Sequence, residues 1–353
     1  MINPAMGENL IAAEIRRTYA EAELRVLESM SRELTKGRTL DVVRWEREKL
    51  ANLRELTGGI NRDVIDYLEN SNHKVADAVE EAYKMGLESA EVDLDKVGQL
   101  QIKGTFTQTH QRAVEALANE VVGKLDATHL RILRSTQDIY RRAVAEAVRG
   151  VVAGAEPRID AAQRVLNTFA NQGVTGFIDN AGRSWNLASY SEMATRSATG
   201  RAAINGHIQR MQDNDRDLVM VSQHGEECEL CRPWEGRVLS ISGEHDSYPS
   251  LAEAEAEGLF HPNCAHNLSA YIHNLTVTDD ATPTPDEYED RQQQRYNERQ
   301  IRKWKRREAA ALTDGESDKA RAKVSEWQSK QREFLDETGR MRKYEREQIN
   351  EAR

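Results

Sequence analysis

The chain is poor in aromatic residues, proline and cysteine. Aromatic residues make up 6% of its 353 residues, and there are 7 prolines and 3 cysteines, whereas 31% of the residues are charged. This composition is typical of long solvated helices rather than of a compact β-sandwich. An odd number of cysteines at metal-type spacing argues against a disulfide framework and favours synthesis in a reducing compartment.

The chain also lacks a long apolar run and an excess of basic residues. No run approaches the roughly 20 apolar residues that span a bilayer, and the N-terminus lacks the pattern of a secretory signal. We therefore expect no membrane partner. The formal net charge of −10 does not suit a protein that wraps nucleic acid with its whole surface, so a DNA contact has to come from a local basic segment.

The first 172 residues have the three- and four-residue spacing of apolar positions that predicts amphipathic helices. The first stripe consists of Ile11, Ile15, Tyr19, Ala22, Val26, Met30 and Leu34. Further stripes predict helices over 45–56, 60–68, 75–86, 113–133, 139–148 and 157–171. The breaks are placed at Gly37, Gly58-Gly59, Ser71-Asn72, the polar stretch 92–104, and Gly154 with Pro157.

The pattern changes at Gly173. A hairpin is predicted over 174–187, a helix over 188–211, strands over 218–222, 238–241 and 268–272, and a short helix over 250–258. The prolines of 282–285 mark a linker, and 286–353 reads as charged helix. We predict a mainly α fold with a small α+β zinc-bearing domain and long amphipathic helices on both sides. The expected parts are a helical region 1–172, the metal-bearing domain 173–275, a linker 276–285 and a C-terminal arm 286–353.

All three cysteines lie in one stretch, each with histidines close by. Cys228 and Cys231 form a C-x-x-C knuckle, and Cys264 stands between His261 and His266. This spacing predicts one structural zinc ion, held by the three cysteines and by His261 or His266. Because every ligand comes from the protein, no position is left for catalysis. The competing interpretation is three small buried hydrophobic residues with unrelated histidines, and two further histidines compete as ligands, His224 and His245.

Two enzyme interpretations have weaker support. Glu244-His245-Asp246 together with the C-x-x-C is weakly similar to the motif of His-Asn-His endonucleases. A second C-x-x-C is missing, and the negative net charge is unfavourable for binding DNA. Glu192 and Arg196 could belong to an ADP-ribosyltransferase-like core, but a solvated pair on a helix accounts for them. We predict no catalytic residues and no enzyme activity.

The segment Arg291–Arg307 is a local basic run with Tyr296 and Trp304 among its cations. It could contact the phosphates of packaged DNA, or it could be a solvated helix facing an acidic protein surface. The low aliphatic content of 286–353 suggests that this arm orders only on binding.

Several stretches, in order along nearly the whole chain, resemble the phage minor capsid protein 2 family, which is similar in role to the Mu F-like head proteins. Trp234-Glu-Gly236 and His261-Pro-Asn-Cys264 are the most specific. The others are Tyr19-Ala-Glu-Ala-Glu23, Trp45-Glu-Arg-Glu-Lys-Leu50, Ala82-Tyr-Lys-Met-Gly86, Tyr190-Ser-Glu-Met193, Asp217-Leu-Val-Met-Val-Ser-Gln-His224, Tyr248-Pro-Ser-Leu251, Arg295-Tyr296, Trp304-Lys-Arg306, Trp327-Gln328 and Arg340 to Tyr344. One departure is Ala265, where the family pattern usually has arginine.

The resemblance implies a structural protein of the virion, made in the bacterial cytoplasm and built into the head of a tailed phage near the portal. Its role would lie in head assembly and in DNA packaging or ejection, with the portal protein or the major capsid protein as partner and several copies in each particle. The alternatives are a virion-packaged nuclease or ADP-ribosyltransferase, and an assembly chaperone absent from the mature particle.

Overall fold

A computed structural model describes residues 10–37, 39–96, 98, 102–154, 156–172, 177–178, 184–223, 229–262, 264–273, 276 and 285–349. The chain forms two compact units that are interleaved along the sequence. Unit 1 comprises 1–14, 72–124 and 192–291, and unit 2 comprises 15–71, 125–191 and 292–353. The domain boundaries predicted from the sequence stay a prediction.

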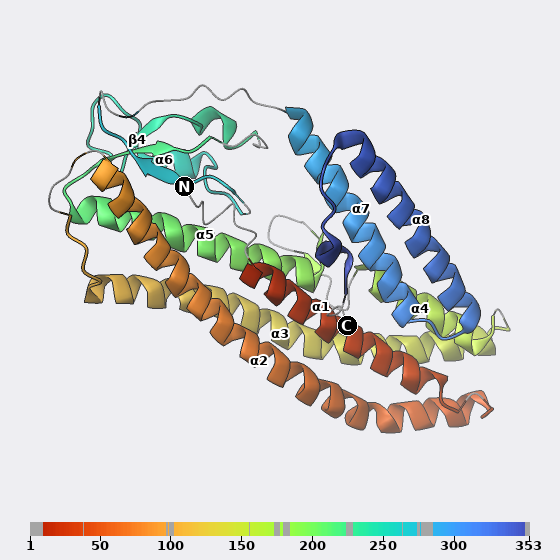
Figure 1. The fold of residues 1–353 in the computed structure, drawn as a ribbon. Coiled ribbons are helices and arrows are strands. Elements are labelled where there is room, and N and C mark those ends of the chain that lie inside the picture. Colours follow the sequence, from red (N-terminus) through yellow and green to blue (C-terminus); the bar gives the residue numbers. More distant parts are fainter. Residues whose placement is uncertain are drawn as a thin grey trace. The chain divides into compact units, whose positions relative to one another are not determined.

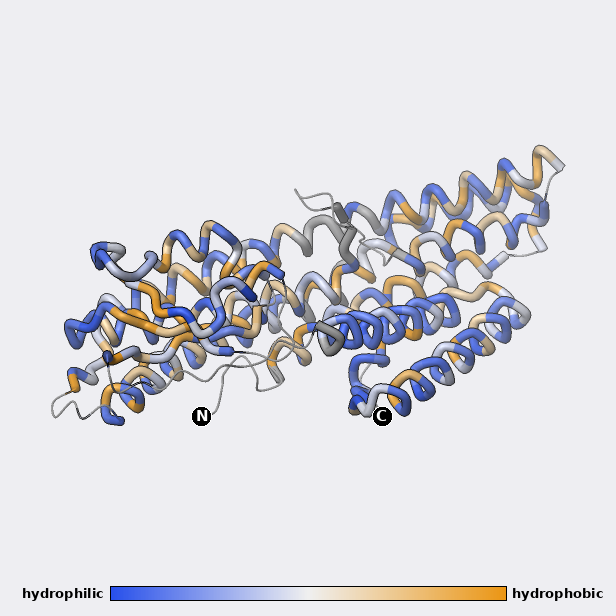
Figure 2. Tube along the Cα trace, turned by 90° about the horizontal axis from the view of Figure 1, so that it is seen from above, coloured by the Kyte–Doolittle hydropathy of each residue, from blue (hydrophilic) through white to orange (hydrophobic). Residues whose placement is uncertain are grey.

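Helices dominate the described part of the chain, as predicted (Figure 1). Their bounds are α1 Leu10–Thr35, α2 Val42–Lys96, α3 Gln108–Val152, α4 Arg158–Gln172, α5 Leu187–Asp213, α6 Leu251–Ala256, α7 Pro285–Ala309 and α8 Asp314–Thr338. Figure 2 shows hydrophobic and hydrophilic residues alternating along the long helices, which is the amphipathic pattern that lets one face pack. None of the helices in the described ranges is long and apolar enough to cross a membrane.

Some predicted breaks are wrong. α2 is one helix of 55 residues that passes through Gly58-Gly59 and Ser71-Asn72, and α3 runs uninterrupted through 134–138. Glycine lowers helix propensity by about 1 kcal/mol but keeps its N–H, so it does not by itself end a helix. The breaks at Gly37 and before Pro157 are confirmed. The predicted break over 92–104 is helical as far as Lys96, and its described residues 98 and 102–104 are not helical.

A three-stranded antiparallel sheet forms one side of unit 1. Its order is β4-β3-β5, with β3 Leu218–Val221 in the middle, β4 Val238–Ser240 on one side and β5 Leu268–Ala270 on the other. Val219 lies opposite Leu239 and Ala270. The predicted hairpin is present in unit 2 as β1 Phe177–Ile178 and β2 Ser184–Trp185, while its turn lies outside the described residues.

The sheet packs on helices of the same unit (Figure 1). One core joins Ala90 and Leu94 of α2, Ile204 and Met211 of α5, and the inward side chains of the strands. Ser250 caps α6 with a capping box, since its side chain accepts from Glu253 N while Glu253 accepts from Ser250 N. α6 contributes Leu251 and Ala254 to the same core, and the turn after it contributes Leu259.

Two glycines bring the backbones of α2 and α5 into direct contact in unit 1. A Cβ atom on Gly86 would lie 2.0 Å from the Ala203 carbonyl oxygen, and one on Gly206 would lie 2.2 Å from the Tyr83 carbonyl oxygen. Beside this crossing, Arg210 pairs with Glu91 at 3.0 Å and donates to the Lys103 carbonyl at 2.7 Å. The crossing holds together the helices that support the sheet.

Unit 2 is a helical core with a buried charge pair. Trp45 is fully buried and donates from Nε1 to the Lys36 carbonyl at 3.2 Å. The fully buried Lys49 Nζ contacts Glu33 Oε1 at 3.0 Å, and Asn52 donates to the same oxygen at 3.2 Å. A buried charge is tolerated only with such partners.

The C-terminal helices α7 and α8 lie side by side, with the Tyr296 ring edge-on to the Trp327 ring at 5.7 Å between centroids, and α7 also makes polar contacts with α4 (Figure 1). Arg306 is 5% exposed and donates from Nε to the Ala170 carbonyl at 2.9 Å. Gln163 of α4 donates to the Ala310 carbonyl at 3.2 Å. The described residues 286–349 therefore bury polar as well as apolar side chains. That this arm orders only on binding stays a prediction.

Candidate metal centre

Cys231 is positioned by the turn that follows β3. The described part of this turn begins at Glu229 and leads into a short 3-10 helix, Arg232–Trp234, with Pro233 inside it. Trp234 N donates to the Cys231 carbonyl at 2.9 Å, and the Trp234 indole is 6% exposed in the core of the sheet. Because the indole anchors the turn, the Cys231 side chain is held inward, fully buried.

Cys264 and His266 lie on the connection between α6 and β5. Phe260 has a left-handed φ of 58°, which turns the chain before His261-Pro262. Cys264 N then donates to the His261 carbonyl at 2.9 Å. Two bonds tie the end of this connection to β3: Ser222 N donates to the Asn267 carbonyl at 2.8 Å, and Asn267 N donates to Ser222 Oγ at 2.9 Å.

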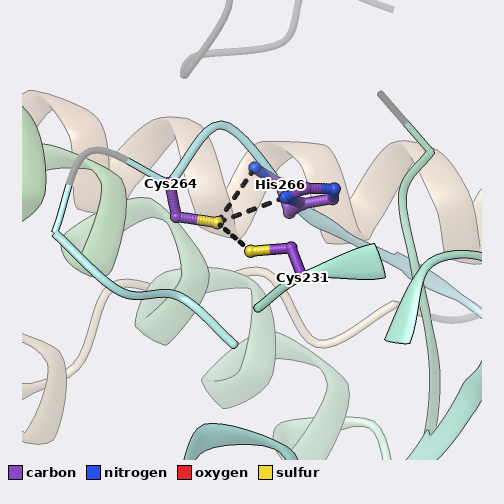
Figure 3. Close-up of side chains that lie close together, drawn as sticks. All are labelled: Cys231, Cys264 and His266. Atoms are coloured by element: carbon purple, nitrogen blue, oxygen red, sulfur yellow. Dashed lines mark hydrogen bonds between the residues drawn. The ribbon is translucent and has the colours of Figure 1, made fainter. Parts of the chain in front are cut away.

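Cys231, Cys264 and His266 converge on one point (Figure 3). Their ligand atoms all lie within 4.8 Å of one another. The two sulfur atoms are 3.6 Å apart, and Cys264 Sγ is 3.2 Å from His266 Nδ1. Cys231 is fully buried and His266 is 4% exposed, while Cys264 is half-buried, so the group is only partly open to water.

The side chains around Cys264 and His266 favour the thiolate form of Cys264 and the protonated form of His266. The hydrogen bond with Cys231 and the contact with His266, opposed by burial, lower the pKa of Cys264 to about 4. Burial acts to lower the pKa of His266, but the contacts with Cys264 and Glu235 raise it above its usual value. A thiolate next to a second thiol is the donor that zinc prefers.

Glu235 contacts the far side of the His266 ring. Its Oε1 is hydrogen-bonded to His266 Nε2, and its side chain is 9% exposed. From the sequence we place Glu235 inside the Trp234-Glu-Gly236 motif but predict no role for its carboxylate. The available signal was a carboxylate four residues after a predicted ligand, inside the most specific motif of the resemblance.

The arrangement admits two kinds of chemistry. Three soft donors within 4.8 Å are most of a tetrahedral zinc site. A cysteine, a histidine and a carboxylate in sequence also resemble the activated nucleophile of a cysteine enzyme. Acyl-transfer chemistry at Cys264 does not need the second thiol that lies 3.6 Å away, whereas structural zinc sites commonly use two or more thiolates. The geometry thus favours metal binding.

The remaining predicted ligands lie elsewhere or outside the described residues. Cys228 and His224 are outside them. His261 is not part of the cluster; its Nδ1 lies 2.9 Å from the Pro262 carbonyl oxygen. His245 is exposed and packs its ring on Tyr248, with centroids 4.9 Å apart. Which of these residues bind a metal stays a prediction.

The residues of the enzyme interpretations do not gather around this cluster in the described ranges. Glu244 and Asp246 are exposed on the loop that carries His245. Glu192 and Arg196 are half-buried and lie four residues apart on α5. This spacing is the one at which charged side chains pair on a helix surface.

The basic run on α7 is divided between internal and outward cations. Arg302 and Lys305 bind residues near the C-terminus, at the Arg346 carbonyl and at Gln348 Oε1. Arg306 is buried. In contrast, Arg299 is exposed over the ring of Tyr296, at 5.9 Å from its centroid, and Lys303 lies 5.9 Å from the centroid of Trp304.

Comparison with known proteins points in one direction. The family model described as "Phage minor capsid protein 2" matches residues 7–336. A "Structural protein" of Lactococcus phage LL-H is 26% identical over 342 residues, which cover 89% of this chain and 91% of that protein. A "Structural protein" of Lactococcus phage mv4 is 36% identical over 95 residues, 25% of this chain and 77% of that protein. No solved structure matches the chain.

Proposed function

Since the chain belongs to the phage minor capsid protein 2 family, we propose that it is a structural component inside the head of a tailed phage, near the portal. The family resemblance carried by Trp234-Glu-Gly236 and His261-Pro-Asn-Cys264 is thereby confirmed. The match over 7–336 is the observation that carries the proposal, and the relatives named structural proteins support it. The proposed role is head assembly together with DNA packaging or ejection.

The metal cluster serves this role as a staple. We propose that Cys231, Cys264 and His266 hold a structural zinc ion, with Cys228 as the fourth ligand on the strength of the C-x-x-C spacing. The ion would join the turn after β3 to the connection before β5. Because the sheet has only three short strands, a staple of this kind supplies stability that its small core lacks.

The staple is tested by the metal content of the full chain purified without added metal. Elemental analysis should find one zinc per chain, and Cys231→Ser or Cys264→Ser should lose it. Cys228→Ser should behave in the same way, while His261→Ala should retain zinc. A wild-type chain free of zinc after purification in reducing buffer would contradict the proposal.

The protein partner is proposed to be the portal protein or the major capsid protein. The support is a group of large side chains exposed after α8: Met341 is 82% exposed and Tyr344 is 61% exposed. Arg342 stacks over Tyr344, 4.5 Å from the ring centroid. Tyrosine, methionine and arginine are enriched at protein interfaces, so this segment is a suitable contact for a neighbouring subunit.

The outward cations of α7 are proposed to contact packaged DNA. Arg299 and Lys303 are four residues apart on one face, each beside an aromatic ring. Lys303 is half-buried, and burial is the main cause that lowers its pKa. The nearby Arg307 and Arg306 lower the pKa further, because positive charge is crowded at this position. An anionic partner relieves this repulsion, and phosphate is the anion that a phage head contains in quantity.

Salt titration of DNA binding by the full chain tests this contact. Arg299→Gln with Lys303→Gln should reduce the slope of log K against log salt by about 2, because each phosphate contact contributes roughly 0.9. The matched control is Lys319→Gln with Lys323→Gln on α8, whose ammonium groups already pair with Glu316 at 3.5 Å and Glu326 at 2.6 Å. An equal effect of both doubles would mean non-specific attraction.

The location is tested on purified particles. Mass spectrometry of intact heads should detect the chain, and density next to the portal should accommodate it. Absence from mature heads would favour the assembly-chaperone alternative. DNA cleavage with magnesium that His245→Ala abolishes, or labelling of host protein from a nicotinamide donor, would instead favour an enzyme.

A further inference from the structure

The hydrogen bond between Glu235 and His266 lies on the side of the ring opposite to the thiols. His266 Nδ1 lies 3.2 Å from Cys264 Sγ, while Nε2 is bonded to Glu235 Oε1. Glu235 is outside the group of mutually close donors, which consists of Cys231, Cys264 and His266 among the described residues. The carboxylate therefore touches the ring and not the point where the three donors meet.

The backbone holds Glu235 rigidly in this position. Before it, Trp234 is anchored in the core. After it, Gly236 N donates to the Val221 carbonyl at 3.1 Å, which binds the loop to the end of β3. Gly236 has a left-handed φ of 68°, and a Cβ atom there would lie 2.9 Å from Gln223 Nε2. Only glycine fits this turn without displacement, so the tripeptide places the carboxylate between two fixed points.

The hydrogen bond between Glu235 and His266 is shielded from water, which strengthens its influence on the imidazole ring. The side chains of Glu235 and His266 are 9% and 3% exposed. The contacts with Cys264 and Glu235 favour the protonated ring, and a metal ligand must be neutral, so one proton leaves the ring when a cation binds. The neutral imidazole keeps its remaining proton on one nitrogen, and the partner of that nitrogen determines which nitrogen remains available as a ligand. A buried carboxylate at Nε2 selects the tautomer with the proton on Nε2.

We propose that Glu235 is a positioning residue for the metal site: it accepts the hydrogen bond from His266 Nε2–H, fixes the ring, and leaves Nδ1 to ligate a soft divalent cation such as zinc. This inference rests on the proposed zinc staple and adds to it the nitrogen used and the residue that selects it. It also explains the Trp-Glu-Gly sequence, because each of the three residues has a separate part in presenting the carboxylate.

Two measurements on the full chain test the inference. The first needs no variant: NMR of zinc-loaded protein with isotope-labelled histidine should show the ring of His266, assigned with His266→Ala, ligated through Nδ1 and protonated at Nε2. The second is zinc affinity by competition with a chelator. Loss of an outer-shell partner typically weakens metal binding by about 10- to 100-fold. We expect the lower value for Glu235→Gln, which keeps an acceptor oxygen, and the higher value for Glu235→Ala.

Glu255→Gln is the matched control, since Glu255 is exposed on α6 in the same unit. It should bind zinc as the wild type does. Charge-transfer absorption of the cobalt-substituted protein should show the same number of thiolate ligands in Glu235→Gln as in the wild type, which separates a positioning role from loss of the fold. Ligation through Nε2, or unchanged affinity in Glu235→Ala, overturns the inference while leaving the zinc staple intact. A wild-type chain without zinc instead overturns the staple itself.

Discussion

The crossing of α2 and α5 predicts an unusual response to two glycine substitutions. Alanine normally stabilises a helix over glycine by about 1 kcal/mol. At Gly86 the new Cβ atom would lie 2.0 Å from a backbone oxygen of the facing helix, and at Gly206 it would lie 2.2 Å from one. Real Cβ contacts essentially never fall below 3.0 Å, so the helices must separate.

The size of the effect follows from what must move. The obstacle is main chain and not the end of a flexible side chain, so no rotamer change relieves it. Overpacking of a core costs about 1–3 kcal/mol, and subtracting the gain of about 1 kcal/mol in helix propensity leaves a net loss of up to roughly 2 kcal/mol for Gly86→Ala or Gly206→Ala. The double variant should lose less than the sum, because one separation of the helices accommodates both methyl groups.

Gly200→Ala provides the control on the same helix. Nothing lies within 4 Å of the position that a methyl group would take there in α5, so this variant should gain up to about 1 kcal/mol. Urea unfolding followed by circular dichroism gives the free energies, and hydrogen exchange of peptides covering 80–92 and 200–212 reports unit 1 separately. Stabilisation by Gly86→Ala equal to that by Gly200→Ala would refute the close crossing.

Three further predictions concern buried polar groups and a cap. Lys49→Met removes the buried cation that contacts Glu33, whose carboxylate keeps the exposed Lys36 at 2.7 Å and Asn52 at 3.2 Å, so the free energy of unfolding should fall by about 1–3 kcal/mol. Lys49→Met with Glu33→Met should recover most of this loss if the weakened pairing of the carboxylate is the cause. His207 is 3% exposed, its ring nitrogens have no hydrogen-bond partner among the described residues, and burial lowers its pKa from 6.5 to about 4. As the pH falls, the imidazole of His207 is protonated in the unfolded chain before it is protonated in the folded chain. The contribution of His207 to the free energy of unfolding should therefore be complete above pH 6.5 and decline towards pH 4 by roughly 3 kcal/mol. Urea midpoints measured at several pH values should show a smaller decline for His207→Leu than for the wild type. Ser250→Ala removes the capping box of α6 and should cost about 1 kcal/mol by thermal unfolding, whereas Ser247→Ala in the preceding turn should cost less.

The candidate site could be anticipated only in part. Spacing in the sequence pointed to cysteines and histidines of 228–266, and three of these residues lie together in the structure. The choice of His266 over His261 as the neighbour of Cys264 depends on the turn at Phe260, whose left-handed backbone no residue pattern announces. Glu235 was missed because its partner is 31 residues away in the sequence, and a single glutamate carries no periodic signal.

The buried polar residues of α7 could not be predicted from the sequence for a related reason. Periodicity detects a helix face by its aliphatic residues, but this helix buries Arg302, Arg306 and Gln294. Each is satisfied by a distant main-chain carbonyl, at Arg346, Ala170 and Met341. A sequence shows which side chains can donate, but not which carbonyls the fold brings within reach.

The sequence alone determined that the chain is mainly helical, where its short strands lie, and which family it resembles, because these properties depend on local periodicity and on contiguous motifs. Only the tertiary structure decided that α2 continues through Gly58-Gly59, that Gly86 and Gly206 bring two helices into contact, and that Glu235 reaches His266. Each of these depends on which backbone lies opposite a given residue. That relation is set by the packing of segments far apart in the chain.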